Sequence, residues 1–248
     1  QPKLGKYDIS SLKLPIVFSQ PCPSELISAF KKIVGVIPLN AYGLTETTAA
    51  ITYTHPSHGE EKLTYSVGKP IPSIQMVLKD DDGKIVPRGE AGEICVKGPV
   101  VMKGYWKRPE EDAKVFDADG FLHTGDMGRF EEDGSLVIVG RKKEMYIRGG
   151  ENVYPPQIED AICKHPDVML AAVVGRPHEK WGEVGRAYIM PKPGKNPTPE
   201  EIKEFLKDKL SNFKIPEDVI IRPILPLTPL GKVKKLDLYT EMKQEFGA

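Results

Sequence analysis

The chain has 248 residues, and its 35 Lys and Arg residues balance its 35 Asp and Glu residues, which gives a net charge of zero. This balance argues against a broad positive surface for nucleic acid or for an acidic membrane. With 40% apolar and 28% charged residues, the composition is typical of a globular protein of one or two domains, and the apolar runs are too short to form a transmembrane segment.

The three cysteines, Cys22, Cys95 and Cys163, lie far apart and form no CxxC pair. An odd number of cysteines without metal-binding spacing favours a reducing compartment, so we expect a cytoplasmic protein. The five histidines form no HxH or HExxH pattern, which argues against a structural zinc site. The sequence gives no indication of the oligomeric state.

Residues 1–65 are predicted to form the end of a parallel α/β sheet. An apolar stretch at 15–18 predicts a short strand, and Ser24 is placed to cap a helix that ends before Gly35. Residues 36–39 then predict a second strand. A strand, a helix and a strand in this order favour two parallel strands.

Residues 66–140 have the pattern of an antiparallel β-structure. Short apolar stretches at 74–78, 92–96 and 136–139 are separated by turn signals. These signals are the pairs Asp82-Gly83, Asp119-Gly120 and Asp133-Gly134. We therefore expect a meander of antiparallel strands that forms a small β-barrel or sandwich.

Residues 141–248 predict a compact α+β module. Pro155 and Pro156 lead into a helix, and residues 170–174, 187–190 and 219–221 read as strands. Thr198 and Glu201 have the spacing of a capping box around Pro199. The chain as a whole is predicted to be mixed α/β and α+β, with one domain portion at 1–140 and a second domain at 141–248.

A candidate ligand site follows the second predicted strand, in the stretch Asn40-Ala41-Tyr42-Gly43-Leu44-Thr45-Glu46. Open α/β sheets bind ligands beyond the carboxyl ends of their strands. An aromatic ring, a glycine, a hydroxyl and a carboxylate could there stack a base, admit the ligand, hold a phosphate oxygen and hold a magnesium ion. The alternative is a tight turn before a capped helix.

A second candidate is the stretch His123-Thr124-Gly125-Asp126, which we expect in a turn between two strands. A carboxylate beside a glycine can accept hydrogen bonds from both hydroxyls of a ribose. The alternative is an Asx-turn without a ligand.

Two basic stretches complete the candidates. Val139–Pro156 combines several cations and glycines and ends in two prolines, which is typical either of a surface turn or of a hinge between two bodies. In Pro226–Lys235, prolines and a Gly turn hold Lys232 at a fixed place, where its ammonium group suits the oxygens of a phosphate. We interpret Lys234 and Lys235 as part of a solvated basic strand.

Five stretches occur in a specific order over nearly the whole chain. They are YGLTE at 42–46, GEICVKGPVVMKGYW at 92–106, DGFLHTGD at 119–126, GRKKEMYIRGGENVYPPQIE at 140–159 and PLTPLGKVKK at 226–235. Together they resemble the adenylate-forming family, which includes acyl-CoA synthetases, firefly-type luciferases and peptide-synthetase adenylation domains. The GGEN loop within the fourth stretch resembles that of CoA ligases in particular.

The resemblance implies a reaction in two steps. A carboxylic acid attacks the α-phosphate of ATP to form an acyl-adenylate, and a thiol then displaces AMP. This implies ATP, Mg²⁺ and coenzyme A as cofactors and a small carboxylic acid as substrate, as in fatty acid metabolism. The implied residues are Tyr42 at the adenine with Gly43 beside it, Thr45 at a phosphate, Glu46 at magnesium, Asp126 at the ribose, Arg141 at the nucleotide, and Lys232 between the acyl carboxylate and the α-phosphate.

The resemblance also implies a mobile C-terminal lid. Lys143 falls at the hinge position of the family, and Gly149 and Gly150 would line a channel for pantetheine because they have no Cβ. A further group lies where some CoA ligases hold the CoA nucleotide, although Ile215 stands where we expect a basic residue. This group consists of Trp181, Phe213 and Lys214. The alternative for Trp181 is the core of the lid.

The sequence departs from the family in its first part. The Ser/Thr/Gly-rich phosphate loop with its lysine is absent from residues 1–41, and residues 18–23 differ from the usual Gly/Ala-rich turn. We therefore interpret the chain as the C-terminal part of an ATP-dependent acid–thiol ligase. The alternatives are adenylation for a carrier-protein thiol, a luciferase-like reaction, or a non-catalytic nucleotide-binding module.

Overall fold

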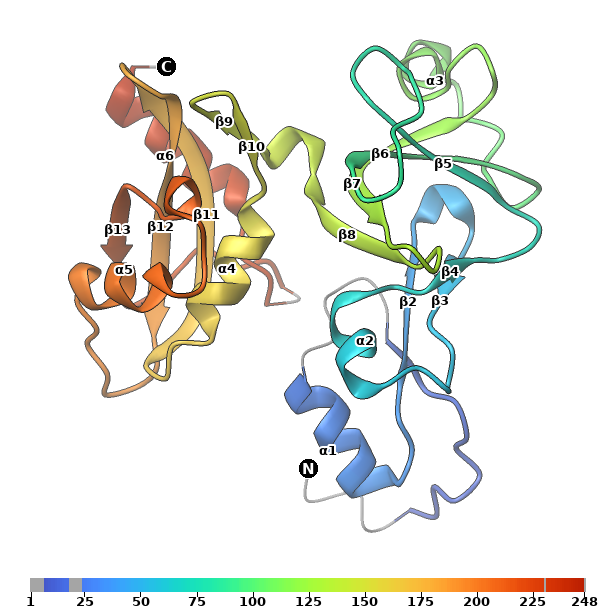
Figure 1. The fold of residues 1–248 in the computed structure, drawn as a ribbon, viewed down its shortest axis with the longest axis horizontal. Coiled ribbons are helices and arrows are strands. Elements are labelled where there is room, and N and C mark those ends of the chain that lie inside the picture. Colours follow the sequence, from blue (N-terminus) through green and yellow to red (C-terminus); the bar gives the residue numbers. More distant parts are fainter. Residues whose placement is uncertain (1–6, 18–23, 230, 248) are drawn as a thin grey trace. The chain divides into compact units, whose positions relative to one another are not determined.

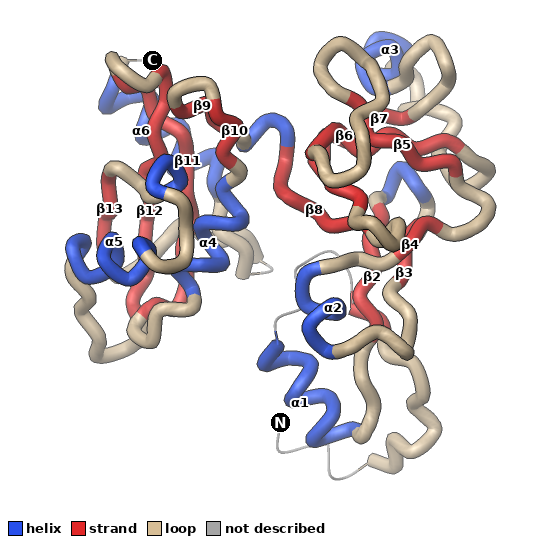
Figure 2. The backbone as a smooth tube through the Cα atoms, in the orientation of Figure 1, coloured by secondary structure: helices blue, strands red, loops and turns tan. Residues whose placement is uncertain are grey.

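The computed structural model describes residues 7–17, 24–229 and 231–247, with the backbone alone at 24–26. Contacts between residues divide the chain into two compact units, Gln1–Ile138 and Val139–Ala248. Each unit has its own sheets, helices and hydrophobic core (Figures 1 and 2). Several sequence predictions lie outside the described residues, namely the end of the first strand at Phe18, the unusual segment 18–23, and the capping side chain of Ser24.

The first unit begins with a mixed sheet of four strands in the order β1-β2-β3-β4. The strands are β1 (Ile16–Val17), β2 (Leu39–Gly43), β3 (Ala50–Tyr53) and β4 (Lys69–Pro70). Helix α1 (Ser24–Val34) connects β1 to β2, which are parallel, so the predicted strand–helix–strand unit is confirmed. The remaining pairs are antiparallel, and the sheet therefore is not purely parallel.

Strand β2 begins and ends later than the sequence predicts. The segment 36–39 contributes only Leu39 to the strand, which continues through Tyr42 and Gly43. The cause is tertiary, because threonine hydroxyls stabilise this extended backbone. The N–H of Asn40 donates to Oγ1 of Thr54 at 2.8 Å, and the N–H of Tyr42 donates to Oγ1 of Thr52 at 3.2 Å. Tyr42 therefore lies on the sheet, not in the turn that follows.

The second sheet of this unit has four strands in the order β5-β6-β7-β8. They are β5 (Gln75–Lys79), β6 (Ala91–Lys97), β7 (Leu122–Phe130) and β8 (Leu136–Arg141). The antiparallel pairing of β5 with β6 and of β6 with β7 confirms the predicted meander. The expected barrel is wrong for the described strands, which form an open path. Four strands are too few to close a barrel around side chains.

The two sheets of the first unit share one core. Buried side chains from both sheets form it, and they are Tyr42, Ile51, Ile74, Leu78, Ile94, Val96, Leu122 and Leu136. The sheets meet at Gly68, whose C=O accepts from the N–H of Leu136 at 2.7 Å. Gly68 has φ +81°, and a Cβ there would lie 1.8 Å from the C=O oxygen of Tyr53. Only glycine permits this junction, which draws the first sheet toward the second.

The described part of the first unit also contains the short helices α2 (Glu60–Tyr65) and α3 (Pro109–Val115) and the single 3₁₀ turn η2 (Thr45–Thr47). Helix α2 packs on α1 through Leu63 and Ile27, which are both almost fully buried. The turn η2 directly follows β2 and carries two of the predicted site residues, Thr45 and Glu46.

The second unit is a five-stranded sheet with helices on both faces. Its strands are β9 (Tyr146–Arg148), β10 (Glu151–Val153), β11 (Val168–His178), β12 (Gly182–Pro191) and β13 (Asp218–Ile221). The order is β10-β9-β12-β11, and β13 pairs in parallel with β12. The helical segments are η3 (Lys142–Glu144), α4 (Pro155–Cys163), α5 (Pro199–Lys207), η4 (Asn212–Lys214) and α6 (Lys235–Phe246).

Alternation along the long strands explains how both faces are covered. On one face, Val173, Ala187 and Ile189 pack with side chains of α4 and α5. On the other face, Tyr188 and Met190 pack with α6. The predicted capping box at the start of α5 is confirmed, since Thr198 and Glu201 exchange both hydrogen bonds.

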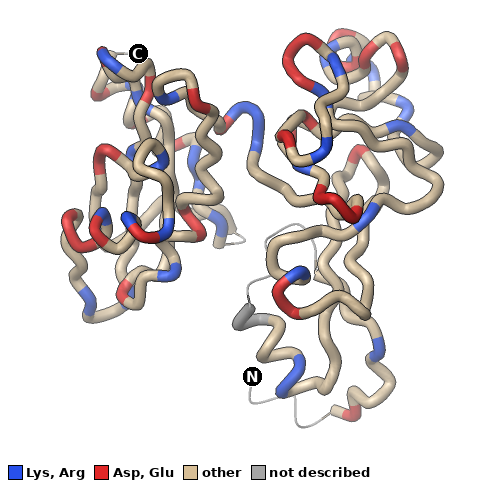
Figure 3. Tube along the Cα trace, in the orientation of Figure 1, with Lys and Arg blue, Asp and Glu red and all other residues tan. Residues whose placement is uncertain are grey.

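Charged residues of both signs occur throughout both units (Figure 3). This distribution agrees with the zero net charge of the chain. Within the described ranges, no helix combines the length and the apolar character needed to cross a membrane.

Candidate functional site

Tyr42 and Asp126 are far apart in the sequence, and the first unit brings them together. The hydroxyl of Tyr42 on β2 donates a hydrogen bond to Oδ2 of Asp126 on β7 at 2.8 Å. The two residues are 9% and 7% exposed. An aromatic ring and a carboxylate thus meet where the two sheets share their core.

The stretch that carries Asp126 lies within a strand, and the predicted turn between two strands is wrong. The pairing of β6 with β7 jumps from Cys95–His123 to Glu93–Met127, so that β7 bulges between these pairs. Gly125 in the bulge has φ +71°, a conformation that favours glycine. Bulges of this kind re-aim a side chain, and here the re-aimed side chain is the carboxylate of Asp126.

Thr124 holds the bulge on one side. Its hydroxyl donates to the C=O of Ile94 at 2.9 Å and accepts from the N–H of Asp126 at 3.1 Å. A side-chain hydroxyl thereby replaces the regular ladder of hydrogen bonds between the strands. The position of Asp126 is fixed from the backbone as well as from its carboxylate.

Thr45 and Glu46 lie next to this site in the chain. Thr45 is exposed, whereas Glu46 is half-buried and accepts a hydrogen bond at 2.9 Å from the hydroxyl of Tyr105. This bond to a carboxylate raises the pKa of Tyr105. The role of Tyr105 as partner of Glu46 is not visible in the sequence, although the residue lies within one of the five stretches.

The backbone around Glu46 is tightly constrained. A Cβ on Gly43 would lie 2.2 Å from the C=O oxygen of Ala49, so glycine is required where the chain folds back. Thr48 has φ +65°, which is strained for a residue with a branched side chain. Its hydroxyl donates to the C=O of Val100 at 2.8 Å and helps to hold that conformation.

The described residues do not form a complete metal site of their own. Within them, no group of three or more His, Cys, Asp or Glu side chains could hold an ion. Mg²⁺ at nucleotide sites commonly takes one or two carboxylates and completes its coordination with phosphate oxygens and water. A single carboxylate at Glu46 fits that kind of site.

In the second unit, the predicted CoA residues gather around one turn. The N–H of Gly149 donates to the C=O of Trp181 at 2.8 Å, and a Cβ on Gly149 would lie 3.0 Å from Cε3 of the Trp181 ring. Gly149 and Gly150 are exposed and have φ of +60° and +91°. Trp181 is 40% exposed, so the alternative of a fully buried core residue is wrong.

Arg148 connects this turn to the predicted residues of η4. Its guanidinium donates to the C=O of Phe213 at 3.2 Å and to the C=O of Ile215 at 2.8 Å. Lys214 donates to Oε1 of Gln157 on α4 at 2.8 Å. Gly149, Gly150, Trp181, Phe213 and Lys214 therefore belong to one neighbourhood of the second unit, and the connection through Arg148 is not evident from the sequence.

Three further predicted residues lie on connecting segments of the second unit. Arg141 ends β8 and is exposed, and Lys143 is exposed in η3. Lys232 is exposed in a tight turn with Thr228, in which the N–H of Lys232 donates to Oγ1 of Thr228 at 3.1 Å. The N–H of Thr228 donates in return to the C=O of Lys232 at 2.7 Å, so the backbone that carries Lys232 is held firmly.

The sequence suggested that Lys235 is part of a solvated basic strand, and this interpretation is wrong. Lys235 begins α6, and its Nζ lies 2.8 Å from Oε2 of Glu144 and 2.8 Å from Oε1 of Glu159. We call these three residues the Lys235 triad. Their side chains are only 23%, 25% and 15% exposed. Burial alone would lower the pKa of Lys235, but the two carboxylates raise it.

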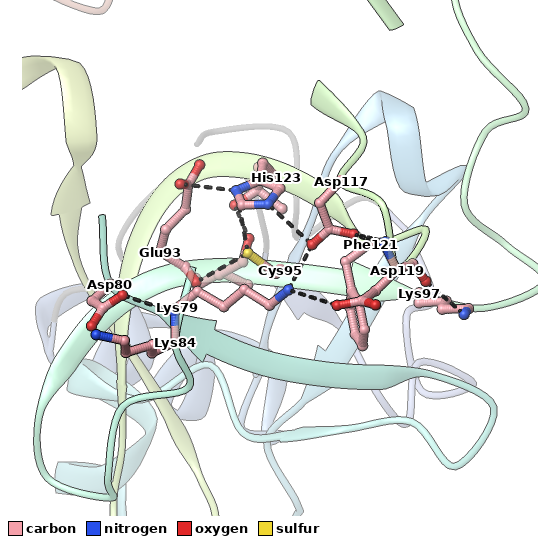
Figure 4. Close-up of polar contacts among 12 residues, drawn as sticks. Lys79, Asp80, Lys84, Glu93, Cys95, Lys97, Asp117, Asp119, Phe121 and His123 are labelled. Carbon is pink, nitrogen blue, oxygen red and sulfur yellow. Dashed lines mark hydrogen bonds and ion pairs between the residues drawn. The ribbon is translucent and has the colours of Figure 1, made fainter. Parts of the chain in front are cut away.

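A second polar cluster, which the sequence did not reveal, lies beside the bulge (Figure 4). Nζ of Lys79 lies 2.6 Å from Oδ2 of Asp117, and the same oxygen lies 3.3 Å from Nε2 of His123. On its other side, Nδ1 of His123 lies 3.1 Å from Oε2 of Glu93. Glu93 and Lys79 are buried, both 6% exposed.

Asp117 should make the first unit sensitive to acid. Burial alone would raise the pKa of Asp117, but hydrogen bonds from Lys79, Phe121 and His123 lower it to about 2 from an ordinary value of 3.8. The stabilisation is thus present above about pH 4 and is lost as the pH falls toward 2. We expect the free energy of unfolding of the first unit to fall by about 1 kcal/mol or more over this pH range, allowing for solvent screening.

The variant Asp117→Asn should flatten this dependence. The measurement is denaturant unfolding between pH 5 and pH 2 (about the range of the shift). Asp119→Asn is the matched control, because Asp119 is 79% exposed and lies 3.8 Å from the same lysine. An unchanged acid dependence in Asp117→Asn would contradict the prediction.

The sequence and the fold are similar to those of known proteins. A model of AMP-binding enzymes matches residues 1–106, and a model of the AMP-binding enzyme C-terminal domain matches residues 157–232. The putative acyl-CoA synthetase YngI of Bacillus subtilis is 38% identical over 248 residues, which are 99% of this chain and 45% of YngI.

Two solved structures are similar over most of the chain. ATP-bound MatB from Rhodopseudomonas palustris has a TM-score of 0.82 and 36% identity, over 92% of this chain and 45% of MatB. The amide bond synthetase McbA from Marinactinospora thermotolerans has a TM-score of 0.84 and 34% identity, over 97% of this chain and 49% of McbA. The chain thus spans about half the length of these proteins. The two matching models and these similarities identify the chain as a member of the AMP-binding, adenylate-forming enzyme family.

Proposed function

We propose that the chain supplies the C-terminal half of an ATP-dependent acid–thiol ligase of the acyl-CoA synthetase type. Its relatives include acyl-CoA synthetases, and the observation that carries the proposal is the contact at 2.8 Å between Tyr42 and Asp126. In this proposal the described chain acts together with an upstream half such as its relatives carry. We call the chain together with that half the long form.

The first step of the proposed reaction is adenylation. A carboxylate oxygen of the acid bonds to the α-phosphorus of ATP, and the bond to the leaving pyrophosphate breaks. Tyr42 would stack on the adenine beside Gly43, Asp126 would accept hydrogen bonds from the ribose, and Thr45 would contact a phosphate. Lys232 would stabilise the negative charge that develops between the carboxylate and the α-phosphate. Magnesium at Glu46 would neutralise phosphate charge when it is bound.

The second step is transfer to the thiol of coenzyme A. The sulfur bonds to the acyl carbon, and the bond from that carbon to AMP breaks. The exposed Gly149-Gly150 turn fits a passage for the pantetheine arm because it lacks side chains. Trp181, Phe213 and Lys214 would contact the nucleotide of CoA, and Arg141 would contact the adenylate.

We further propose that the two steps use two arrangements of the domains. In this proposal residues 1–140 belong to the large AMP-binding domain, residues 141–248 form the lid, and the chain pivots at Lys143. The boundary between the two units lies nearby, between Ile138 and Val139. Lys143 is exposed in the 3₁₀ turn η3 near the start of the second unit, where its backbone can absorb the rotation that such a pivot requires.

The proposed function is tested by two assays on the long form with a panel of carboxylic acids. Acid-dependent release of pyrophosphate from ATP tests adenylation, and formation of an acyl-CoA tests transfer. Pyrophosphate release without any acyl-CoA would contradict the ligase assignment and would favour a carrier-protein or luciferase-like reaction. Binding of AMP with no release of pyrophosphate would favour a non-catalytic nucleotide-binding module.

The similarity to McbA favours a second candidate, in which an amine and not a thiol accepts the acyl group. The adenylation step and its residues would be the same. Adding an amine in place of CoA to the second assay distinguishes the two candidates, because only an amide-forming enzyme would then consume the acyl-adenylate rapidly.

Replacing Gly149 with alanine should affect only the second step. An L-residue at φ +60° is strained, and the new Cβ would press on the Trp181 ring at 3.0 Å. We expect transfer to CoA to slow about tenfold or more, since about 1–2 kcal/mol of strain falls on this turn. Adenylation should keep its rate.

Gly194→Ala is the matched control for Gly149→Ala. Gly194 has φ +77°, but a Cβ there would have no atom within 4 Å. The control therefore adds similar backbone strain in the same unit without a contact to Trp181. Equal slowing of transfer in both variants, or an equal loss of adenylation and transfer in Gly149→Ala, would contradict the prediction.

A further inference from the structure

The carboxylate of Glu93 on β6 lies at the bulge that carries Asp126. Its Oε1 accepts a hydrogen bond from the N–H of Gly125 at 3.1 Å, and its Oε2 lies 3.1 Å from Nδ1 of His123. Glu93 is only 6% exposed. A buried carboxylate is expensive unless it is well paired, so this placement requires both contacts.

The contact with Gly125 replaces a bond that the bulge removes. A bulge leaves backbone groups without a partner in the ladder between strands. Gly125 directly precedes Asp126, and Glu93 provides an acceptor for its N–H. Tyr42 holds the carboxylate of Asp126 from the other side at 2.8 Å. Glu93 thus restrains the backbone from which the side chain of Asp126 projects.

His123 and Asp117 connect Glu93 to a buried cation. Figure 4 shows the contacts from Glu93 through His123 and Asp117 to Lys79. Lys79 ends β5, and its ammonium group also lies 4.9 Å from the centre of the Phe121 ring. Side chains from two neighbouring strands, β5 and β7, and from a loop therefore fix the orientation of Glu93. Such a network restrains a group more strongly than a single contact would.

We propose that Glu93, oriented by His123, is a positioning residue for recognition of the ribose by Asp126. This rests on the proposed role of Asp126 as the acceptor of the ribose hydroxyls. With Glu93 in place, the bulge presents the Asp126 carboxylate in one direction. Without it, the backbone at Gly125 loses its acceptor and the carboxylate is no longer aligned with two hydroxyls at once. Loss of Glu93 should therefore weaken binding only of ligands that carry the ribose hydroxyls. If Glu93 had a purely structural role, its loss would weaken binding of all nucleotides alike.

The experiment compares binding of AMP and of 2′,3′-dideoxyAMP to the long form by calorimetry. The dideoxy nucleotide lacks both hydroxyls that Asp126 would contact. We expect Glu93→Ala to weaken binding of AMP about tenfold or more, as for the loss of a positioned charge-assisted hydrogen bond. Binding of 2′,3′-dideoxyAMP should change less than about twofold, which is the ordinary scatter for a site left intact.

Further variants make the result specific. Glu93→Gln keeps an oxygen for the N–H of Gly125, so it should restore most of the affinity for AMP. In the background of Asp126→Ala, the change Glu93→Ala should have no further effect, because two residues that act through one contact are not additive. Glu90→Ala is the matched control, since Glu90 is an exposed glutamate just before β6.

The outcomes separate this inference from the proposed function. Equal weakening of AMP and 2′,3′-dideoxyAMP by Glu93→Ala, or full additivity with Asp126→Ala, would overturn the positioning role. Failure of the wild-type long form to release pyrophosphate would refute the ligase assignment, while the binding data would still decide the role of Glu93. If Glu93→Ala does not fold, the decision passes to His123→Ala, which removes the contact that orients Glu93 and must then weaken binding of AMP more than binding of 2′,3′-dideoxyAMP.

Discussion

Replacing Lys232 with alanine is expected to remove adenylation and to leave transfer to CoA largely intact. Loss of a preorganised contact to developing charge typically slows a reaction about 10²–10³-fold. Lys232 is exposed, and the hydrogen-bonded turn with Thr228 holds its backbone in place, so its ammonium group can reach a ligand. In the proposed reaction this group is needed only while the α-phosphate is attacked.

The measurement uses the long form with two starting points. Acid-dependent pyrophosphate release reports adenylation, and conversion of a supplied acyl-adenylate by CoA reports transfer alone. Lys234→Ala is the matched control, because it removes an exposed lysine from the same stretch and should change neither rate. An equal loss of adenylation and transfer in Lys232→Ala would refute the prediction that Lys232 acts in adenylation alone.

Replacing Lys235 with methionine should destabilise the second unit strongly. The Lys235 triad places one ammonium group between the carboxylates of Glu144 and Glu159, all largely buried. Removing one partner of a buried ion pair costs about 3–5 kcal/mol, because it leaves uncompensated charge. Here two carboxylates would remain face to face, and burial already raises the pKa of Glu159.

The unfolding of the second unit can be followed separately. The chain has two tryptophans, Trp106 and Trp181, so Trp106→Phe leaves one fluorescent reporter in the second unit of the chain. Trp106 is 86% exposed, and its replacement should be neutral. In this background Lys235→Met should lower the denaturant midpoint markedly, whereas Lys234→Met should not.

A compensating variant distinguishes charge imbalance from lost packing. Glu144→Gln and Glu159→Gln added to Lys235→Met remove both carboxylates, and most of the stability should return. If the triple variant stays as unstable as Lys235→Met alone, the aliphatic part of the lysine and not its charge would be responsible. Unchanged stability in Lys235→Met would contradict the importance of the triad altogether.

Local signals in the sequence predicted the elements that depend on local physics. The capping box of Thr198 and Glu201 forms as expected, because both hydrogen bonds lie within one helical turn. Gly83, Gly120 and Gly134 adopt φ near +80° at the predicted turns. The order of β1, α1 and β2 was sufficient to predict their parallel pairing, since right-handed crossovers dominate such units.

The errors arise where distant residues decide the outcome. Thr52 and Thr54 extend β2 beyond its predicted end, and no local pattern around Tyr42 indicates this. Lys235 reads as a solvated lysine because its partners Glu144 and Glu159 lie far away in the sequence.

The candidate site shows the same division. Sequence similarity suggested Tyr42 and Asp126 one at a time, and the fold shows that they touch. The stretch around Asp126 has the composition of a turn, but pairing of β7 with β6 absorbs it as a bulge. The sequence does not single out Tyr105 or Glu93, because each is defined by a contact with a distant residue. Tyr105 donates a hydrogen bond to Glu46, and Glu93 accepts one from the N–H of Gly125.

The Lys235 triad has a consequence for how copies of the protein behave toward one another. Strand β11 lies at one end of the path of strands in its sheet, where exposed peptide groups invite a foreign strand. One of these groups is the N–H of Val173, which donates a hydrogen bond to the carboxylate of Glu159 at 2.7 Å. The same carboxylate forms an ion pair with the ammonium group of Lys235. The N–H of Val173 is therefore already bonded within the protein and is not available to pair with a strand of another copy.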